Sequence, residues 1–103
     1  MAGEKTLAEI LESTGLPVTF ALWGKSPPDL PYIVYLVDDS ESFSADNVTY
    51  HYEDNYNIEL YSERKDPIRE ALVEAALTEN DIYFEKEEDW IVSEEMYRVV
   101  YSV

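Results

Sequence analysis

Residues 30–37 read LPYIVYLV and form the most apolar run of the chain. β-Branched and aromatic side chains dominate this run, which predicts a strand that is buried on both faces in the interior of a sheet. Pro31 falls at the beginning of the run, where a missing backbone donor is tolerated. This strand therefore anchors the predicted sheet, and the other elements are placed around it.

Upstream of that strand, the sequence predicts one short helix and one further strand. Thr6 and Glu9 have the spacing of a capping box, and apolar residues then recur on one helical face. These signals predict a helix over residues 6–14. We expect Gly15 to end it by taking a positive φ. Residues 18–23 alternate in the manner of a strand, and the Gly- and Pro-containing segment 24–29 predicts a loop.

Downstream of the anchor strand, the sequence predicts a long acidic loop and more strand. Residues 38–47 show no periodicity and are rich in acids, so we expect an exposed loop there. Residues 47–62 alternate as strands do. They form either one long strand kinked near residues 54–55 or a hairpin, and the pattern leaves both open.

The second half of the chain predicts one more helix and the closing strands. Asp66 and Pro67 suit an N-cap and a first helical position, which indicates a helix over residues 66–79. Strands are expected within residues 82–103, the first starting at residues 82–84, with the acidic run 85–89 at its solvated end or in a turn. The apolar positions at helical spacing in 66–79 are Ile68, Ala71, Leu72, Ala75 and Ala76.

Together these elements predict a single α+β domain over residues 1–103, in the order α-β-β-β-α-β-β. We expect an antiparallel sheet of four to five strands with two amphipathic helices on one face. The 103 residues are 46% hydrophobic, which is enough apolar material for one core.

Charge excludes several classes of function. Seven Lys and Arg stand against 23 Asp and Glu, for a net charge of −16. Such a surface repels phosphate backbones and anionic lipids, so neither sequence-specific nucleic-acid binding nor membrane binding is expected. No apolar run is long enough to cross a bilayer, and residues 1–15 lack the apolar segment of a signal peptide.

The sequence contains few combinations of residues that could support catalysis or metal binding. With no Cys, the chain has no thiolate nucleophile and no thiolate zinc site. His51 is the only histidine and is interpreted as a structural strand residue. Acidic runs at 38–41 and 87–89 lack the spacing of a calcium loop and are interpreted as solvated charge, or as protection against edge pairing of strands. We therefore predict a protein that is not an enzyme and that has no metal or cofactor site, and the pattern leaves weak, unspecific cation binding by the acidic runs open.

Aromatic residues provide the candidates for an interface. Nine tyrosines fall mainly in predicted strands, where they either pack or serve as contact residues with other proteins. Phe43 lies in an otherwise polar loop without a periodic partner. For Trp23 and Trp90 we expect core packing. The candidate interface residues are Phe43, Tyr50, Tyr52, Tyr61, Asp38, Asp39 and Glu41.

From about residue 16 onward, the chain resembles small proteins of phages and prophages of Gram-positive bacteria. The resemblance lies in PPDLPYIVY at 27–35, ADN at 45–47, IELY at 58–61, KDP at 65–67 and SEEMY at 93–97. Those proteins are similar to the tail-completion, or tail-terminator, family of long-tailed phages. Head–tail joining proteins of the same apparatus have a similar size.

The resemblance implies a structural protein rather than an enzyme. In that family, a compact α+β subunit forms a hexameric ring that caps the tail tube and meets the head connector. The implied partners are further copies of the chain and other tail or connector proteins. The implied location is the bacterial host cytoplasm during assembly and then the virion tail. We further hypothesise that part of the negative charge lines a channel for DNA, since a basic lumen would hold the passing duplex.

An acidic inhibitor that mimics DNA is the alternative function. Small size and strong negative charge suit it as well. A mimic should present carboxylates at regular spacing along one exposed face. We expect the acids to collect in loops and at strand ends instead, which favours the structural protein.

Overall fold

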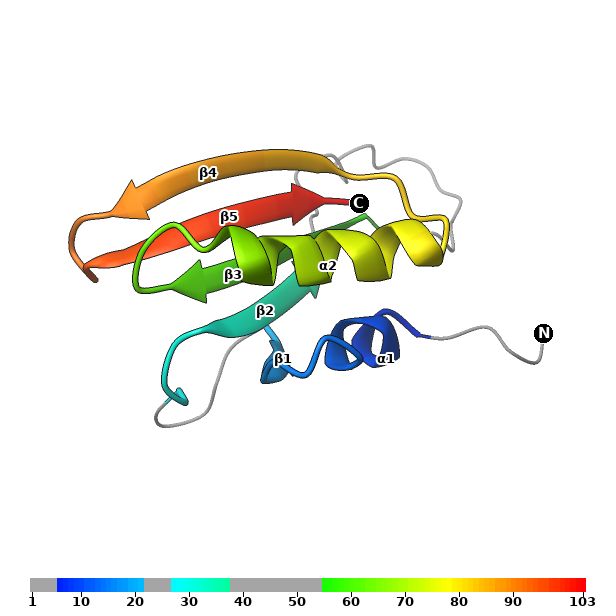
Figure 1. Cartoon of the computed structure of the whole chain (residues 1–103), viewed down its shortest axis with the longest axis horizontal. Helices are drawn as coiled ribbons and strands as arrows, with labels where there is room; N and C mark the ends of the chain where they lie inside the picture. The colour runs from blue at the N-terminus through cyan, green and yellow to red at the C-terminus, as the bar shows by residue number, and fades with distance from the viewer. Residues whose placement is uncertain (1–5, 22–26, 38–54) are drawn as a thin grey trace, which may run out of the picture.

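In a computed structural model, two helices lie against one face of a five-stranded sheet (Figure 1). The structure describes residues 6–21, 27–37 and 55–103. The predicted α+β class and the element order are confirmed. In chain order the elements are α1 (Leu7–Glu12), β1 (Val18–Phe20), β2 (Tyr32–Val37), β3 (Tyr56–Ser62), α2 (Pro67–Glu79), β4 (Glu85–Ile91) and β5 (Met96–Ser102).

The sheet is mixed, and the prediction of a purely antiparallel sheet was wrong. Its strand order is β1-β2-β3-β5-β4. The pairs β2–β3, β3–β5 and β4–β5 are antiparallel, whereas β1 runs parallel to β2. A tight hairpin of two to five residues forces neighbouring strands to be antiparallel. The connection between β1 and β2 runs from residue 21 to residue 31, which is long enough to return the chain to the same end of the sheet.

The core lies between the helices and one face of the sheet. In-register rows on this inner face cross the sheet, one of them joining Ile33, Leu60 and Val99 on β2, β3 and β5. All three side chains are fully buried. The row that joins Tyr35, Ile58 and Tyr101 lies beside them. The two helices cover these rows with Ile10, Leu11, Val73, Ala76 and Leu77.

Helix α1 follows its sequence prediction closely. The Thr6 hydroxyl accepts a hydrogen bond from the Glu9 N–H at 3.2 Å, and the Glu9 carboxylate accepts one from the Thr6 N–H at 3.0 Å. This is the predicted capping box. The helix ends at Glu12, two residues earlier than predicted, and Gly15 takes a φ of +87°. Its local signals were therefore sufficient to place it.

Helix α2 begins as predicted but turns a different side toward the sheet. The Asp66 carboxylate accepts from the Arg69 N–H at 3.1 Å, which confirms the N-cap. Of the predicted apolar face, only Ala76 is buried; Ile68, Ala71, Leu72 and Ala75 are exposed. The buried side consists of Glu70, Val73, Ala76 and Leu77. Apolar residues occur on both sides of this helix, so periodicity alone does not decide which side packs.

The C-terminal strands confirm one prediction and correct another. β5 has Tyr97, Val99 and Tyr101 on the inner face, as expected. By contrast, residues 82–84 precede β4, and the acidic run 85–89 forms most of that strand. Because β4 pairs with only one neighbour and is almost wholly exposed, solvated charges are tolerated at these positions.

Other sequence predictions fall on residues that the structure does not describe. The acidic loop 38–47, the choice between a kinked strand and a hairpin within 47–62, and Trp23 lie wholly or partly outside the described residues. Within the described part of the chain, no helix is both long and apolar enough to span a bilayer.

Candidate interaction surfaces

Of the seven predicted interface residues, Tyr61 alone lies in the described part of the chain. It stands on β3, on the sheet face opposite the helices, directly across from Tyr32 on β2. The two ring centroids are 5.4 Å apart. The Tyr61 hydroxyl donates to the Glu59 carboxylate at 2.6 Å. The six others, Phe43, Tyr50, Tyr52, Asp38, Asp39 and Glu41, lie outside the described residues.

Tyr61 belongs to a row that crosses this outer face. Arg98 lies opposite Tyr61 on β5, and Asp89 lies opposite Arg98 on β4. The Arg98 guanidinium donates to both Asp89 oxygens, at 3.1 and 3.0 Å. Burial, followed by the hydrogen bond to Glu59, raises the pKa of Tyr61. The hydroxyl of Tyr61 is thus already engaged within the chain.

A charged network joins α2 to β4 on the inner face. Lys86 is the only cation of β4, and its side chain points toward the helix. Its ammonium group lies 2.9 Å from the Glu70 carboxylate and 2.7 Å from the Glu74 carboxylate. Tyr101 donates to the same Glu74 oxygen at 2.9 Å. Lys86 therefore bridges two successive turns of α2.

Lys65 extends this network to the loop before α2. Its ammonium group lies 3.0 Å from Glu70 Oε1 and 2.7 Å from Glu88 Oε1. Tyr97 also donates to Glu88. Glu70 is 3% exposed, and its second oxygen, Oε2, has no hydrogen-bond partner among the described residues. Glu70 is thus a buried carboxylate that two lysines compensate through a single oxygen.

The network shifts the pKa values of Glu88 and Lys86 in the direction that favours ion pairing. The hydrogen bond from Lys65, followed by that from Tyr97, lowers the pKa of Glu88. Burial works to lower the pKa of Lys86, but hydrogen bonds to Glu74 and Glu70 outweigh it and raise the pKa. Among the described residues, no cluster of three or more acidic or histidine side chains is arranged to hold a metal ion. The ion pairs of Lys86 with Glu70 and Glu74 join β4 to α2.

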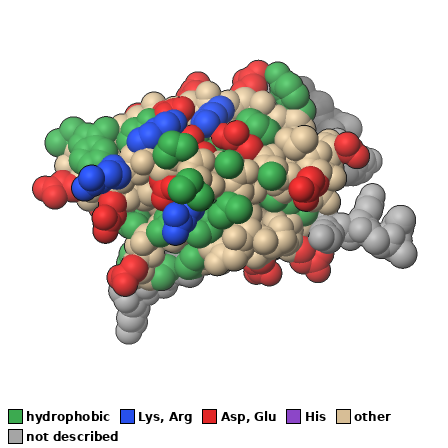
Figure 2. Space-filling view, in the orientation of Figure 1, with side chains coloured by type: hydrophobic (Ala, Val, Ile, Leu, Met, Phe, Trp, Pro, Cys, Tyr) green, Lys and Arg blue, Asp and Glu red, His purple; other side chains and the backbone are tan. Residues whose placement is uncertain are grey.

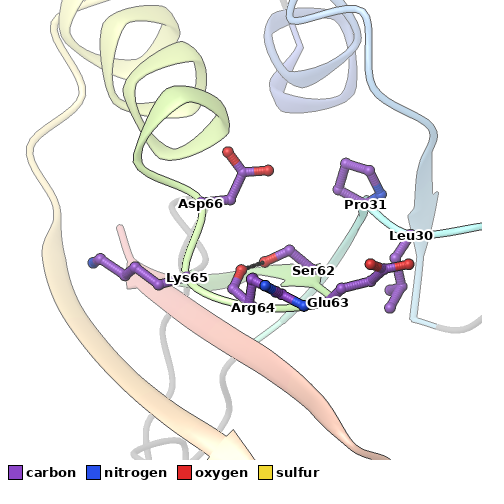
Figure 3. Close-up of a pocket in the computed structure, with 7 residues that line it drawn as sticks. All are labelled: Leu30, Pro31, Ser62, Glu63, Arg64, Lys65 and Asp66. Carbon is purple, nitrogen blue, oxygen red and sulfur yellow. Dashed lines mark hydrogen bonds between the residues drawn. The ribbon is translucent and has the colours of Figure 1, made fainter.

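A polar hollow of about 260 Å³ lies where β3 leads into α2 (Figure 3). Residues 62–66 form one side, and Leu30 and Pro31 form the other. The buried Ser62 hydroxyl donates to the Arg64 carbonyl at 2.9 Å, which shapes the loop. Lys65 points away from the hollow. Arg64 makes no ion pair within the described ranges, which leaves one uncompensated cation at this end of the molecule.

The first exposed apolar surface runs along α2. We name Ile68, Ala71, Leu72 and Ala75 the outer row of α2. Ile68 is 68% exposed and Leu72 is 41% exposed. Figure 2 shows hydrophobic side chains along this helix on the side that faces away from the sheet. Neither the sheet nor α1 covers this row.

The second exposed apolar surface is the end of the β4–β5 hairpin. We name Trp90 and Val92 the hairpin tip. They are 47% and 76% exposed, and a hydrophobic patch is visible at this end of β4 (Figure 2, left). The expectation that Trp90 packs in the core was wrong. Trp90 is the next-to-last residue of the edge strand β4, where it lies opposite Tyr97 of β5.

The third exposed apolar surface lies at the other end of β4. A shallow hollow of about 450 Å³ is lined by Thr78, Asp81, Ile82, Tyr83 and Phe84, and we name it the end hollow. Ile82 and Phe84 pack against the core and form its floor, whereas Tyr83 is 81% exposed. Asp81, in the turn before it, takes a positive φ of 61°.

Sequence reasoning found none of these three surfaces. Two of them had a signal in the sequence. The α2 segment has apolar residues on more than one side, and Tyr83 lies between the apolar residues Ile82 and Phe84. Comparisons with protein-family models, curated proteins and solved structures found no match to this chain.

Proposed function

We propose that this chain is a structural subunit of a phage particle, of the tail-completion or head–tail joining type. One observation carries the proposal: three separate apolar surfaces are exposed on a small, strongly acidic chain. Exposed apolar patches mark protein–protein contacts, and a subunit inside an assembly needs more than one of them. The sequence resemblance to small phage proteins supplies the kind of assembly.

The rigid part of the fold suits such a role. The core and the charged network hold α2 firmly against the sheet, so the outer row is presented on a fixed helix. A rigid surface loses little conformational entropy when it binds. The exposed acids keep free subunits soluble and separate until assembly.

Deleting the gene from the phage or prophage genome tests this function. Electron microscopy of the resulting particles should show filled heads and separate tails, and infectivity should fall at least a thousandfold. The wild-type gene in trans should restore joining. An Ile68→Glu/Leu72→Glu variant should fold, because both side chains are exposed, but it should not restore joining. Intact, infectious particles from the deletion would overturn the proposal.

One observation favours the DNA-mimic alternative. Glu85, Glu87 and Asp89 alternate along the outer face of β4. Two residues along a strand span about 6.6 Å, which gives the regular spacing that a mimic needs. However, the row contains three carboxylates, and Arg98 neutralises one of them. Salt-sensitive capture of a host DNA-binding protein, lost in Glu85→Gln/Glu87→Gln, would promote this alternative.

A further inference from the structure

The backbone of β4 (Glu85–Ile91) is unpaired along one side. The strand pairs with β5 only, and Figure 1 shows no labelled strand beyond it. In an antiparallel pair, every second residue directs its backbone N–H and C=O groups away from the partner strand. Among the described residues, no backbone group outside β5 bonds to β4. A row of backbone donors and acceptors is therefore available to a further strand.

The structural features that usually protect an edge strand are missing from β4. Proteins block such edges with very short strands, prolines, bulges or a covering segment. β4 has seven residues, contains no proline and keeps an unbroken one-to-one register with β5. The opposite edge of the sheet differs, because β1 has only three residues. Within the described chain, charge is thus the one protection that β4 has.

This charge repels one kind of strand and attracts another. The outer face of β4 carries Glu85, Glu87 and Asp89 at alternate positions, whereas its only cation, Lys86, points inward to α2. Two copies of β4 placed side by side would bring carboxylates next to carboxylates, which is destabilising. A strand with Lys or Arg at every second position would instead place a cation beside each acid.

Two of the three acids on this outer face lack an ion pair with the described residues. Asp89 pairs with Arg98, whereas Glu85 and Glu87 have no such partner there. The whole chain has seven Lys and Arg against 23 Asp and Glu, so cations are too few to pair with each acid one to one. Glu85 and Glu87 are therefore available to the cations of a partner.

The inner face of the same edge offers an apolar contact. Trp90 lies on this face opposite Tyr97 of β5, and it is 47% exposed. An apolar side chain on an added strand would cover the ring, and aromatic and β-branched side chains that face each other across two strands stabilise the pair. The edge thus suits a segment that is cationic on one face and apolar on the other.

We propose that β4 binds an extended basic segment of another protein, which adds to the five-stranded sheet as a further strand. The backbone of β4 supplies the hydrogen bonds, Glu85 and Glu87 select Lys or Arg at alternate positions, and Trp90 contacts the apolar face of the segment. In this mode of recognition, backbone pairing gives affinity and side chains give specificity. The proposal goes beyond the proposed function, because it depends on the edge of β4 and not on the kind of assembly.

A synthetic peptide of seven residues with alternating Lys and Val tests this binding. Its length matches that of β4, and as a strand it places every Lys side chain on one face. NMR follows hydrogen exchange of the β4 amides in the full chain. When about nine in ten copies carry the peptide, the amides that point away from β5 should exchange about tenfold more slowly, because only free copies expose them.

Two protein variants with the same change in charge separate the edge from general attraction. Glu85→Gln/Glu87→Gln should weaken peptide binding about tenfold, because it removes two charge pairs between neighbouring strands. Glu63→Gln/Glu79→Gln is the matched control, since both residues are exposed and lie outside β4. At physiological salt it should change binding less than about twofold, because distant exposed charges are screened. Circular dichroism establishes that each variant is folded.

Two N-methylated peptides separate strand pairing from charge. One is methylated at every Lys amide and the other at every Val amide, and these two sets of backbone donors point to opposite sides of a strand. One of the two peptides should bind as the parent does. The other should lose measurable binding, because only one set of donors faces β4.

Three results would overturn the proposed strand addition. They are no binding at about 1 mM peptide, binding without slower exchange in β4, and equal binding of the two methylated peptides. Binding that needs Glu85 and Glu87 but leaves exchange unchanged would leave only the charge attraction that the DNA-mimic alternative requires. The deletion experiment tests the proposed function separately, so failure of the strand addition leaves that function standing.

Discussion

The inner side of α2 meets the sheet in two different ways. Over β3 and β5 the contact is apolar, and Val73 and Leu77 are fully buried against Leu60, Val99 and Tyr101. Toward β4 the contact is ionic, with Glu70 and Glu74 reaching Lys86. Apolar burial is nondirectional and stabilises wherever water is excluded, whereas buried charge stabilises only when every partner is present. The two regions should therefore respond differently to substitution.

The largest effect is expected in the apolar region. Leu77→Ala should lower the free energy of unfolding by about 2–5 kcal/mol, because it removes buried methylene and methyl groups and leaves a cavity. Urea denaturation followed by circular dichroism measures this loss. A loss below about 1 kcal/mol would show that the side chain is not part of the core.

Removing the central cation of the ionic region should have the next largest effect. Lys86→Met should cost about 1.5–3 kcal/mol, because it leaves Glu70 and Glu74 facing each other across the position of the lost charge. The same urea experiment measures it. In the double variant Glu70→Leu/Lys86→Met, the cost should be less than the sum of the two single costs. Additive costs would mean that the two side chains do not interact.

The pH dependence of the ionic region gives a smaller effect. Glu88 has a folded-state pKa below its ordinary value of 4.5, so its contribution to stability is present above that pH. The contribution is lost as pH falls through the lowered folded-state pKa. The difference in unfolding free energy between wild type and Glu88→Gln should therefore be constant near neutral pH and narrow in acid below pH 4.5.

The control for this experiment is Glu87→Gln on the same strand. Glu87 lies on the outer face and loses no ion pair with the described residues when it is replaced. This variant removes one carboxylate from β4 and leaves the bond from Lys65 to Glu88 intact. A constant difference for Glu88→Gln would show that the bond from Lys65 to Glu88 contributes nothing to folding.

The smallest effect is expected on the outer row of α2. Ile68→Ala should change the unfolding free energy of the dilute protein by no more than about 0.5 kcal/mol, because the side chain is largely exposed and alanine favours helix. It is the surface counterpart of Leu77→Ala on the same helix. A loss as large as that of Leu77→Ala would mean that the row is buried in the isolated subunit and is not a contact surface.

Much of the fold was predictable because its signals are local. The capping box at Thr6 and Glu9, the Asp66 cap and the alternation that ends at Tyr101 each depend on residues a few positions apart. The candidate surfaces were not predictable. Trp90 and the outer row of α2 are exposed because no other element of the described chain packs over them. No short stretch of sequence carries that information.

The amino-acid sequence by itself determined the elements, their order and the acidic character of the chain. Only the tertiary structure decided that β1 runs parallel to β2, that the acidic run forms an edge strand, and which side of α2 faces the sheet. The physical reason is the same in each case. Local hydrogen bonding and periodicity select helix or strand, but apolar residues on both sides of α2 leave its rotation open. In the folded chain Val73 and Leu77 pack in the core, and Glu70 and Glu74 meet Lys86 on β4, which are contacts between residues far apart in the chain.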